Sequence, residues 1–144
     1  MNDLMKKVLF MALAVIFAMP LFAQRINYEV IAKVPFDART MHYGKVDPVK
    51  MNIVRVGNQV IYIGPDKYTI KKTDTAFKDS VMEYLEYDAT DETGQEYTIK
   101  VAYDGTATPD VMRHFVLIFN DNDIYNWTYY YTSAGKEMTD EDSK

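Results

Sequence analysis

Cysteine is absent from all 144 residues of the chain. Its absence excludes disulfide bonds, thiol nucleophiles and zinc sites built on cysteine. It also excludes the acylated cysteine that tethers bacterial lipoproteins to a membrane. The folded part must therefore be stabilised mainly by the burial of apolar side chains.

Side chains suited to acid–base or nucleophilic catalysis are also scarce. The whole supply of histidine and serine is His42, His114, Ser80, Ser133 and Ser143. None of the serines stands in a nucleophile-type turn, and Gly135-Lys136 lacks the flanking residues of a phosphate-binding loop. We therefore expect a protein that is not an enzyme, with no catalytic residue, no metal and no cofactor. A hydrolase that uses two carboxylates is the least favoured alternative, because sequence does not show which carboxylates meet in space.

Long apolar runs are missing except at the start of the chain. Residues 8–22 form an apolar stretch of 15 residues, shorter than the roughly 20 that a membrane-spanning helix needs. Lys6 and Lys7 precede this stretch, and the small residue Ala23 follows it. These are the three parts of a secretory signal peptide, which predicts cleavage before Gln24 and export to the periplasm or the outside. An uncleaved membrane anchor is the alternative, and after cleavage we expect no stable membrane anchor.

Basic residues are outnumbered by acidic ones. Without residues 1–23, which carry Asp3, Lys6 and Lys7, 14 basic side chains stand against 20 acidic ones, a net charge of −6. Nucleic-acid binding requires clustered Lys and Arg, so this balance argues against a nucleic-acid partner.

The rest of the chain carries the period-two pattern of β-strands. Ile26, Tyr28, Val30, Ala32 and Val34 alternate with more polar residues, which predicts a half-buried strand that ends at Pro35. The other predicted strands span residues 51–56, 59–63, 67–71, 80–88, 95–103, 111–119 and 124–132. Residues 111–119 are almost entirely apolar, as expected of a strand covered on both sides. Residues 72–79 are polar and predicted to form a loop, and residues 133–144 a mobile acidic tail.

Short turns between consecutive strands favour antiparallel neighbours. The sequence therefore predicts a single all-β domain over residues 24–132, an antiparallel meander of seven or eight strands closed into an up-and-down, calycin-like barrel. A two-sheet β-sandwich is the alternative. The interior of the domain is the feature that bears most on function, because an empty interior would accommodate a ligand.

The combination of the start MNDLMKKVLF, the predicted cut before Gln24, the absence of cysteine and the Tyr-rich hairpins ending YNWTYYYT resembles small exported β proteins of Bacteroidota. Many of these have no assigned activity, and some have lipocalin-like or calycin-like barrels. The Gly-x-Trp motif of lipocalins has no counterpart in Arg25–Lys33. The resemblance therefore implies the fold and export but no site residue.

The most distinctive side-chain pattern lies in the last predicted strand. Tyr125, Trp127, Tyr129 and Tyr131 share one face of this strand. Aromatic rings with polar tips stack on sugars or line apolar pockets, so these four residues are the candidate ligand-binding residues. The competing interpretation, which we favour, is that the row faces inward and forms part of the core, with Trp127 packed in the core or in a pocket wall.

Two further patterns concern surface turns. Asp74-Thr75-Ala76 and Asp79-Ser80-Val81 each resemble the acceptor signal for O-glycosylation in Bacteroidota, which makes Thr75 and Ser80 candidate glycosylation sites. Asp88, Asp91 and Glu92, and likewise Asp121 and Asp123, cluster in predicted turns, but neither group has the spacing of a calcium loop.

The sequence thus predicts an exported, non-enzymatic β domain that binds a small amphipathic ligand, a glycan or a protein through Tyr- and Trp-rich surface. A structural or envelope-associated protein without a small ligand is the main alternative. A deep aromatic pocket would favour ligand binding, and a filled barrel with a flat exposed patch would favour the structural role. Two close carboxylates in a cleft would favour a hydrolase.

Overall fold

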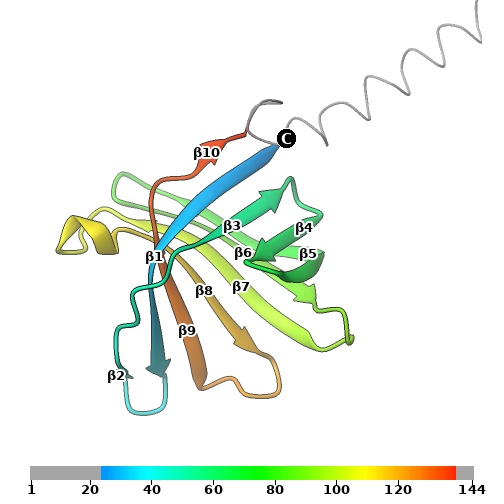
Figure 1. Cartoon of the computed structure of the whole chain (residues 1–144), viewed down its shortest axis with the longest axis horizontal. Helices are drawn as coiled ribbons and strands as arrows, with labels where there is room; N and C mark the ends of the chain where they lie inside the picture. Colours follow the sequence, from blue (N-terminus) through cyan, green and yellow to red (C-terminus); the bar gives the residue numbers. More distant parts are fainter. Residues whose placement is uncertain (1–23, 139–144) are drawn as a thin grey trace, which may run out of the picture.

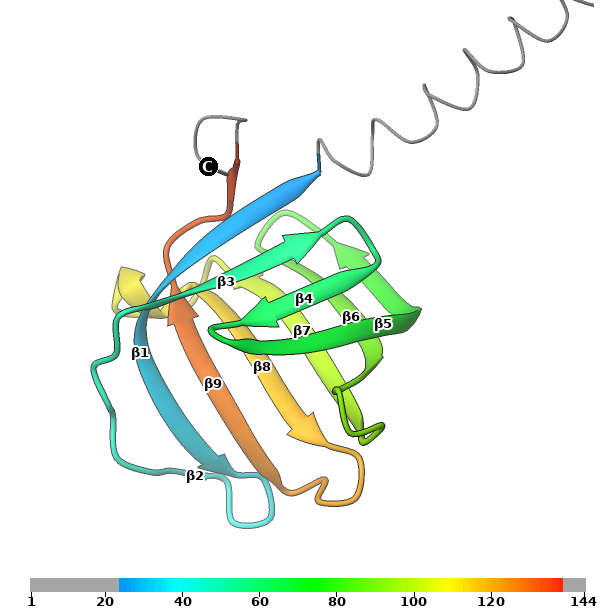
Figure 2. The same ribbon diagram turned by 45° about the vertical axis from the view of Figure 1, so that its right-hand side comes forward.

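The structure is a computed structural model that describes residues 24–138; residues 1–23, which include the predicted signal peptide, and residues 139–144 lie outside the described part. The described chain forms a closed antiparallel barrel of eight strands, as Figures 1 and 2 show from two sides. The predicted calycin-like, up-and-down barrel is therefore confirmed, and the β-sandwich alternative is wrong.

The barrel is wound in simple chain order. Its elements are β1 (Arg25–Asp37), β2 (His42–Tyr43), β3 (Met51–Val56), β4 (Val60–Ile63), β5 (Asp66–Lys78), β6 (Met82–Thr90), β7 (Glu96–Asp104), η1 (Asp110–Met112), β8 (His114–Asn120), β9 (Asn126–Thr132) and β10 (Lys136–Glu137). Neighbours in sequence pair from β3 to β9, and β1 pairs with both β3 and β9, which closes the ring. The short strands β2 and β10 pair with β1 and lie outside this ring of eight.

The middle of the barrel is filled with side chains. Alternate residues of every barrel strand point inward, and Ile53, Ile61, Tyr87, Ile99 and Val116 are completely shielded from solvent. Ile99 shares one face of β7 with Tyr97 and Val101, and this face contributes to the core. Large inward side chains fill the middle of a small barrel, and the two most voluminous hollows described for residues 24–138 lie at its ends.

A bulge divides β1 into two halves that bury opposite faces. Val30 lies opposite Thr132, but the next pair is Ala32 with Tyr131, so Ile31 is an extra residue. One extra residue reverses the facing of all side chains that follow. Val34 and Phe36 are consequently buried on the outer wall of the barrel. The predicted alternation of a half-buried strand is therefore observed through Val34, but the two halves of β1 bury opposite faces.

Proline does not end β1, contrary to the sequence prediction. Pro35 is paired with Thr128 of β9, and its carbonyl oxygen accepts a hydrogen bond of 2.7 Å from the backbone nitrogen of Gly44. Backbone groups of one strand residue point to the same side, so the missing N–H faces the irregular segment after β2 rather than β9. The strand continues through Pro35 because the segment at Gly44 pairs with it through the carbonyl of Pro35 alone, and the pairing with β9 uses no N–H of Pro35.

Two segments predicted to be irregular take part in the sheet. Residues 72–78 extend β5 along β6, with bulges between Ile70 and Lys72 and between Thr73 and Thr75. Residues 133–138 return across the start of β1, where β10 pairs with Ile26 and Asn27. Backbone hydrogen bonds to an adjacent strand hold both segments in the sheet, although their polar side chains bury little apolar surface.

The barrel has two ends of different character. At the first end lie the start of β1, the β3–β4 and β5–β6 turns and the connection from β7 to β8. At the second end lie the β1–β2, β4–β5, β6–β7 and β8–β9 turns. We refer to these as the first end and the second end.

Candidate functional site

The aromatic row of the last strand faces away from the barrel core. Tyr130 packs against the core, and it lies opposite Val116, a core residue. Tyr129 lies opposite Leu117 and Tyr131 opposite Phe115, on the other face of the sheet. The inward assignment of the row, and with it the placement of Trp127 in the barrel core, is therefore wrong.

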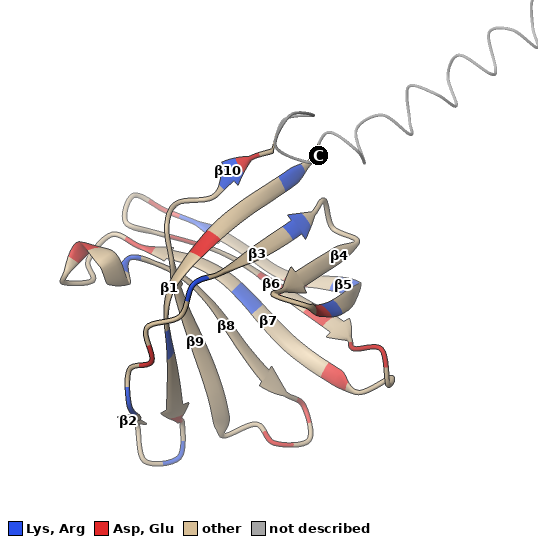
Figure 3. Ribbon diagram, in the orientation of Figure 1, with Lys and Arg blue, Asp and Glu red and all other residues tan. Residues whose placement is uncertain are grey.

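The row instead belongs to a cluster of rings on the outer wall. This outer aromatic cluster consists of Phe36, Tyr43, Phe115, Phe119, Trp127, Tyr129 and Tyr131. The smaller side chains between the rings are almost fully covered, with Val34 3% and Leu117 5% exposed. The strands β8 and β9 carry no Lys, Arg, Asp or Glu, as Figure 3 shows, so no such charge interrupts this part of the wall.

Most ring faces in this cluster are covered by other rings. The indole of Trp127 is stacked on Phe119 at a centroid distance of 5.8 Å, and its Nε1 donates a hydrogen bond of 2.8 Å to the carbonyl of Ile124. Tyr129 and Tyr131 are stacked on each other at 5.8 Å. Burial raises the pKa of Tyr129 to about 12, with Tyr43 contributing. A sugar-binding platform needs exposed ring faces, and these rings offer few.

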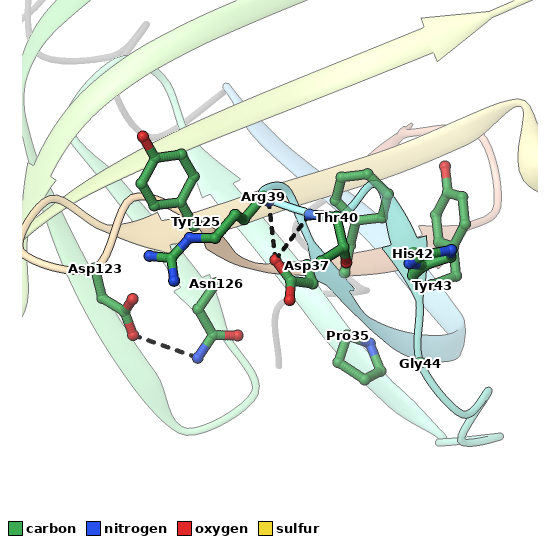
Figure 4. A pocket seen from close by; sticks show the side chains of 11 residues that line it. Pro35, Asp37, Arg39, Thr40, His42, Tyr43, Gly44, Asp123, Tyr125 and Asn126 are labelled. Atoms are coloured by element: carbon green, nitrogen blue, oxygen red, sulfur yellow. Dashed lines mark hydrogen bonds between the residues drawn. The ribbon is translucent and has the colours of Figure 1, made fainter.

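Tyr125, the fourth candidate, is not stacked within this cluster, although Phe36 and Tyr43 line the same hollow as Tyr125. Tyr125 lies at the second end, in a shallow hollow of about 450 Å³ between the β1–β2 and β8–β9 turns (Figure 4). The guanidinium of Arg39 lies 4.8 Å from its ring centroid. Asp37 accepts hydrogen bonds from the backbone of Arg39 and Thr40, and Asn126 bonds Asp123. The polar groups of this hollow thus largely satisfy one another.

A second hollow, of about 480 Å³, opens at the first end of the barrel. Ile26, Tyr28, Leu85 and Val101 supply apolar surface to its wall, and Arg55 supplies a cation. We call it the Arg55 hollow. It lies directly above the filled core, since Ile26, Leu85 and Val101 pack against the core residues.

Arg55 is placed in this hollow by strand alternation. Met51, Ile53 and Arg55 share one face of β3, and Arg55 lies opposite Ile26 on one side and Ile61 on the other. Its Nη1 donates a hydrogen bond of 3.1 Å to the carbonyl of Gly57. Its Nε is buried without a hydrogen-bond partner, and within residues 24–138 no carboxylate lies within 4.0 Å of its side chain.

The far side of the hollow carries polar groups. In the ring of eight strands β7 is four places from β3, so Tyr103 lies across from Arg55. Its ring packs on His114 at 4.7 Å, and burial lowers the pKa of this histidine. Glu83 also lines the hollow, and it forms a long ion pair of 4.0 Å with Lys78. Arg55 is therefore the hollow's uncompensated charge among the residues described.

Sequence reasoning missed the Arg55 hollow. The usable signal was a cation on an apolar strand face, because Arg55 follows Met51 and Ile53 at spacing two. The remaining wall comes from strands far apart in sequence, and no local pattern brings Glu83, Tyr103 and His114 together.

A pair of carboxylates lies on the outer wall of β5 and β6. The hydrogen bond between Asp74 and Asp88 raises the pKa of Asp88 to about 6 and lowers the pKa of Asp74. Lys72 Nζ lies 3.0 Å from Asp74 and 3.9 Å from Asp88. The glycosidase mechanism needs carboxylates about 5 Å or more apart, and these are in direct contact on an exposed wall. Asp88 also lines a hollow of about 330 Å³ with Glu96 and Asp121, but the Asp74–Asp88 pair itself lacks the spacing that the mechanism needs.

The other predicted surface sites are exposed as they would have to be. Thr75 lies in the extended part of β5 and Ser80 in the β5–β6 turn, and both side chains reach solvent. In the described part of the chain no group of three His, Asp or Glu residues is arranged to hold a metal ion.

Comparisons of the chain with protein-family models, with curated proteins and with solved structures each found no match. Over residues 24–138 the structure contains no helix long and apolar enough to cross a membrane. The structure alone therefore defines the class of the protein, a closed eight-stranded up-and-down barrel.

Proposed function

We propose that this protein is an exported, non-enzymatic binding protein that holds a small amphipathic ligand in the Arg55 hollow. The observation that carries the proposal is the composition of the hollow: an apolar floor on the core and the cation Arg55, for which residues 24–138 supply no counter-ion within 4.0 Å. Binding sites for small molecules combine a mostly apolar surface with a few fixed polar groups.

The hollow supports this function better than the predicted aromatic row does. Trp127, Tyr129 and Tyr131 are engaged with one another and with Phe119, so their rings stabilise the wall. Tyr43 is the exposed member of the outer aromatic cluster, at 55% exposure. A glycan or protein bound at Tyr43 and Tyr125 is the second candidate, and a structural role without ligand is the third.

The neutral fluorescent amine N-phenyl-1-naphthylamine tests the proposal, because its emission rises in apolar surroundings. We expect it to bind the purified protein, and Leu85→Trp, which fills the hollow, to weaken binding at least about tenfold, or about 1.4 kcal/mol. Ile31→Trp is the matched control, since Ile31 lies outside the hollow and is exposed. Equal binding by a folded Leu85→Trp protein would contradict this location of the site.

Export is part of the proposal and is supported by the position of the first strand. β1 begins at Arg25, so cleavage before Gln24 would remove no described strand. The predicted glycans on Thr75 and Ser80 also belong to an exported protein. Mass spectrometry of host-grown peptides spanning residues 72–82 tests them, and unmodified peptides would refute them.

A further inference from the structure

We infer that the Arg55 hollow selects an amphipathic anion, whose carboxylate or sulfonate pairs with the guanidinium of Arg55 while its apolar part covers Ile26, Leu85 and Val101. The inference rests on the proposed function and adds to it the chemical class of the ligand. It is carried by the hydrogen-bonding state of Arg55 and by the charges around it.

The guanidinium is under-used by the protein itself. A guanidinium has five N–H donors, and the described structure engages it with the carbonyl of Gly57, through Nη1, and with the hydroxyl of Tyr87. Nε is buried and unpartnered. Buried polar groups normally have partners, and a buried cation without one is costly. A ligand anion would supply acceptors that the chain does not.

The surroundings hold the guanidinium in place. Arg55 is flanked on its own face by Ile26 and Ile61. Arg55 also lies near the hydroxyl of Tyr87. Burial raises the pKa of this hydroxyl, and the positive charge of the guanidinium opposes that rise. That hydroxyl donates a hydrogen bond of 3.2 Å to Oδ1 of Asn58. A cation fixed in this way is preorganised, so binding an anion orders little that is not already ordered.

The other ionisable groups of the hollow do not reverse its sign. Glu83 is balanced by Lys78 at 4.0 Å, and burial holds the pKa of His114 below its ordinary value, so that its ring is uncharged at neutral pH. Arg55 remains as the net charge. Partial burial strengthens its attraction for an anion, because charges interact more strongly away from water.

The apolar part of the ligand is limited in size. The hollow measures about 480 Å³ and ends on the filled core, so a chain cannot continue through the barrel. This volume suits an aryl group or an alkyl chain of medium length. We therefore expect aromatic acids and medium-chain carboxylates rather than long lipids.

A matched pair of dyes separates the charge from the apolar part. 1-Anilinonaphthalene-8-sulfonate differs from N-phenyl-1-naphthylamine only by its sulfonate. We expect the wild-type protein to bind the sulfonate at least about tenfold more tightly, and Arg55→Met to abolish this preference. Octanoate should displace the sulfonate dye at lower concentration than octanol does. Arg25→Met is the matched control, because Arg25 lies on the face of β1 opposite to Ile26 and the hollow. This variant should keep the preference for the sulfonate dye.

The outcomes distinguish this inference from the proposed function. Equal affinity of the wild-type protein for both dyes would overturn anion selection and leave ligand binding in place. Binding of neither dye would overturn both. If Arg55→Met does not fold, the affinities of the wild-type protein for the two dyes are measured at increasing salt concentration. Sodium chloride should weaken binding of the sulfonate dye and leave binding of the neutral dye unchanged. A sulfonate affinity that is insensitive to salt would overturn the inference.

Discussion

The indole of Trp127 packs between two phenylalanine rings on the outer wall, 5.3 Å from Phe36 and 5.8 Å from Phe119. It is half-buried rather than enclosed, so we expect Trp127→Ala to lower the free energy of unfolding by about 2 kcal/mol, less than the 3–5 kcal/mol typical of a fully buried ring. Urea denaturation followed by circular dichroism measures this change. Tyr125→Ala, which loses mainly the contact with Arg39, should cost at most about 1 kcal/mol. A neutral Trp127→Ala would mean that the cluster adds no stability.

The Asp74–Asp88 pair predicts a dependence of stability on pH. The pKa of Asp88 in the folded protein is about 6, above its value in an unfolded chain, so between about pH 4 and pH 6 the folded state binds more protons. The contribution of Asp88 to stability is therefore present at low pH and is lost as the pH rises through 6. The lowered pKa of Asp74 acts in the opposite direction below about pH 4.

Comparison of the wild-type protein with Asp88→Asn measures this effect. The loss of stability between pH 4 and pH 6 should be smaller in Asp88→Asn, which cannot ionise at that position. Carboxylate NMR signals should also show a midpoint near 6 that the substitution removes. A midpoint below 4 for Asp88 would contradict the hydrogen bond between Asp74 and Asp88.

At the level of elements, the C-terminal segment 133–138 depends on the absence of a side chain at Gly135. A Cβ there would lie 2.6 Å from Cε1 of Tyr28 and 2.8 Å from Cγ2 of Ile26. The ring of Tyr28 is buried and does not yield easily. We expect Gly135→Ala to displace the segment at a cost of about 1–3 kcal/mol, whereas Ala134→Ser should be neutral. Thermal unfolding measures the loss of stability. The NMR signal of the Met138 amide, which donates a hydrogen bond to the carbonyl of Arg25, reports the displacement of the segment.

The strands with clear alternation were predictable from the sequence, and their facing was predictable only where no bulge intervened. The 51–56 strand is observed with the predicted bounds, and the strand predicted at residues 95–103 is observed one residue later, as β7. The facing of β9 was predicted wrongly because its inner face also carries an aromatic residue, Tyr130. The bulge at Ile31, which turns Val34 and Phe36 onto the outer wall, has no sequence signal that separates it from plain alternation.

The extension of β5 was hidden by its surface chemistry. Only Asp66–Thr69 pair with β4, so residues beyond Ile70 have strand pairing on one side, with β6. An unpaired strand edge invites association with other chains, and charged side chains and bulges discourage it. Lys72, Asp74 and Lys78 and the two bulges serve that purpose here. The same polar residues led to the prediction of a loop at residues 72–79.

On the scale of the whole molecule, the barrel is complete without the predicted signal peptide. The protein isolated from its native host should begin at or near Gln24, as mass spectrometry of the intact chain would show. The chain over residues 24–144 should then unfold at the same temperature as the full-length protein, because the strands that close the barrel begin at Arg25. An intact Met1 recovered with the membrane fraction would refute cleavage.

The two-sided burial of β8 has a consequence for local opening of the barrel. Val116 and Ile118 face the core while Leu117, on the outer wall, is only 5% exposed. Water reaches this strand from neither face, whereas residues 73–78 of β5 are exposed. In deuterated water the amides of Val116 to Ile118 should exchange last, near the rate set by global unfolding, and those of β5 beyond Thr73 within the earliest time points. Exchange of β8 as fast as that of β5 would mean that the wall opens first along its apolar strands.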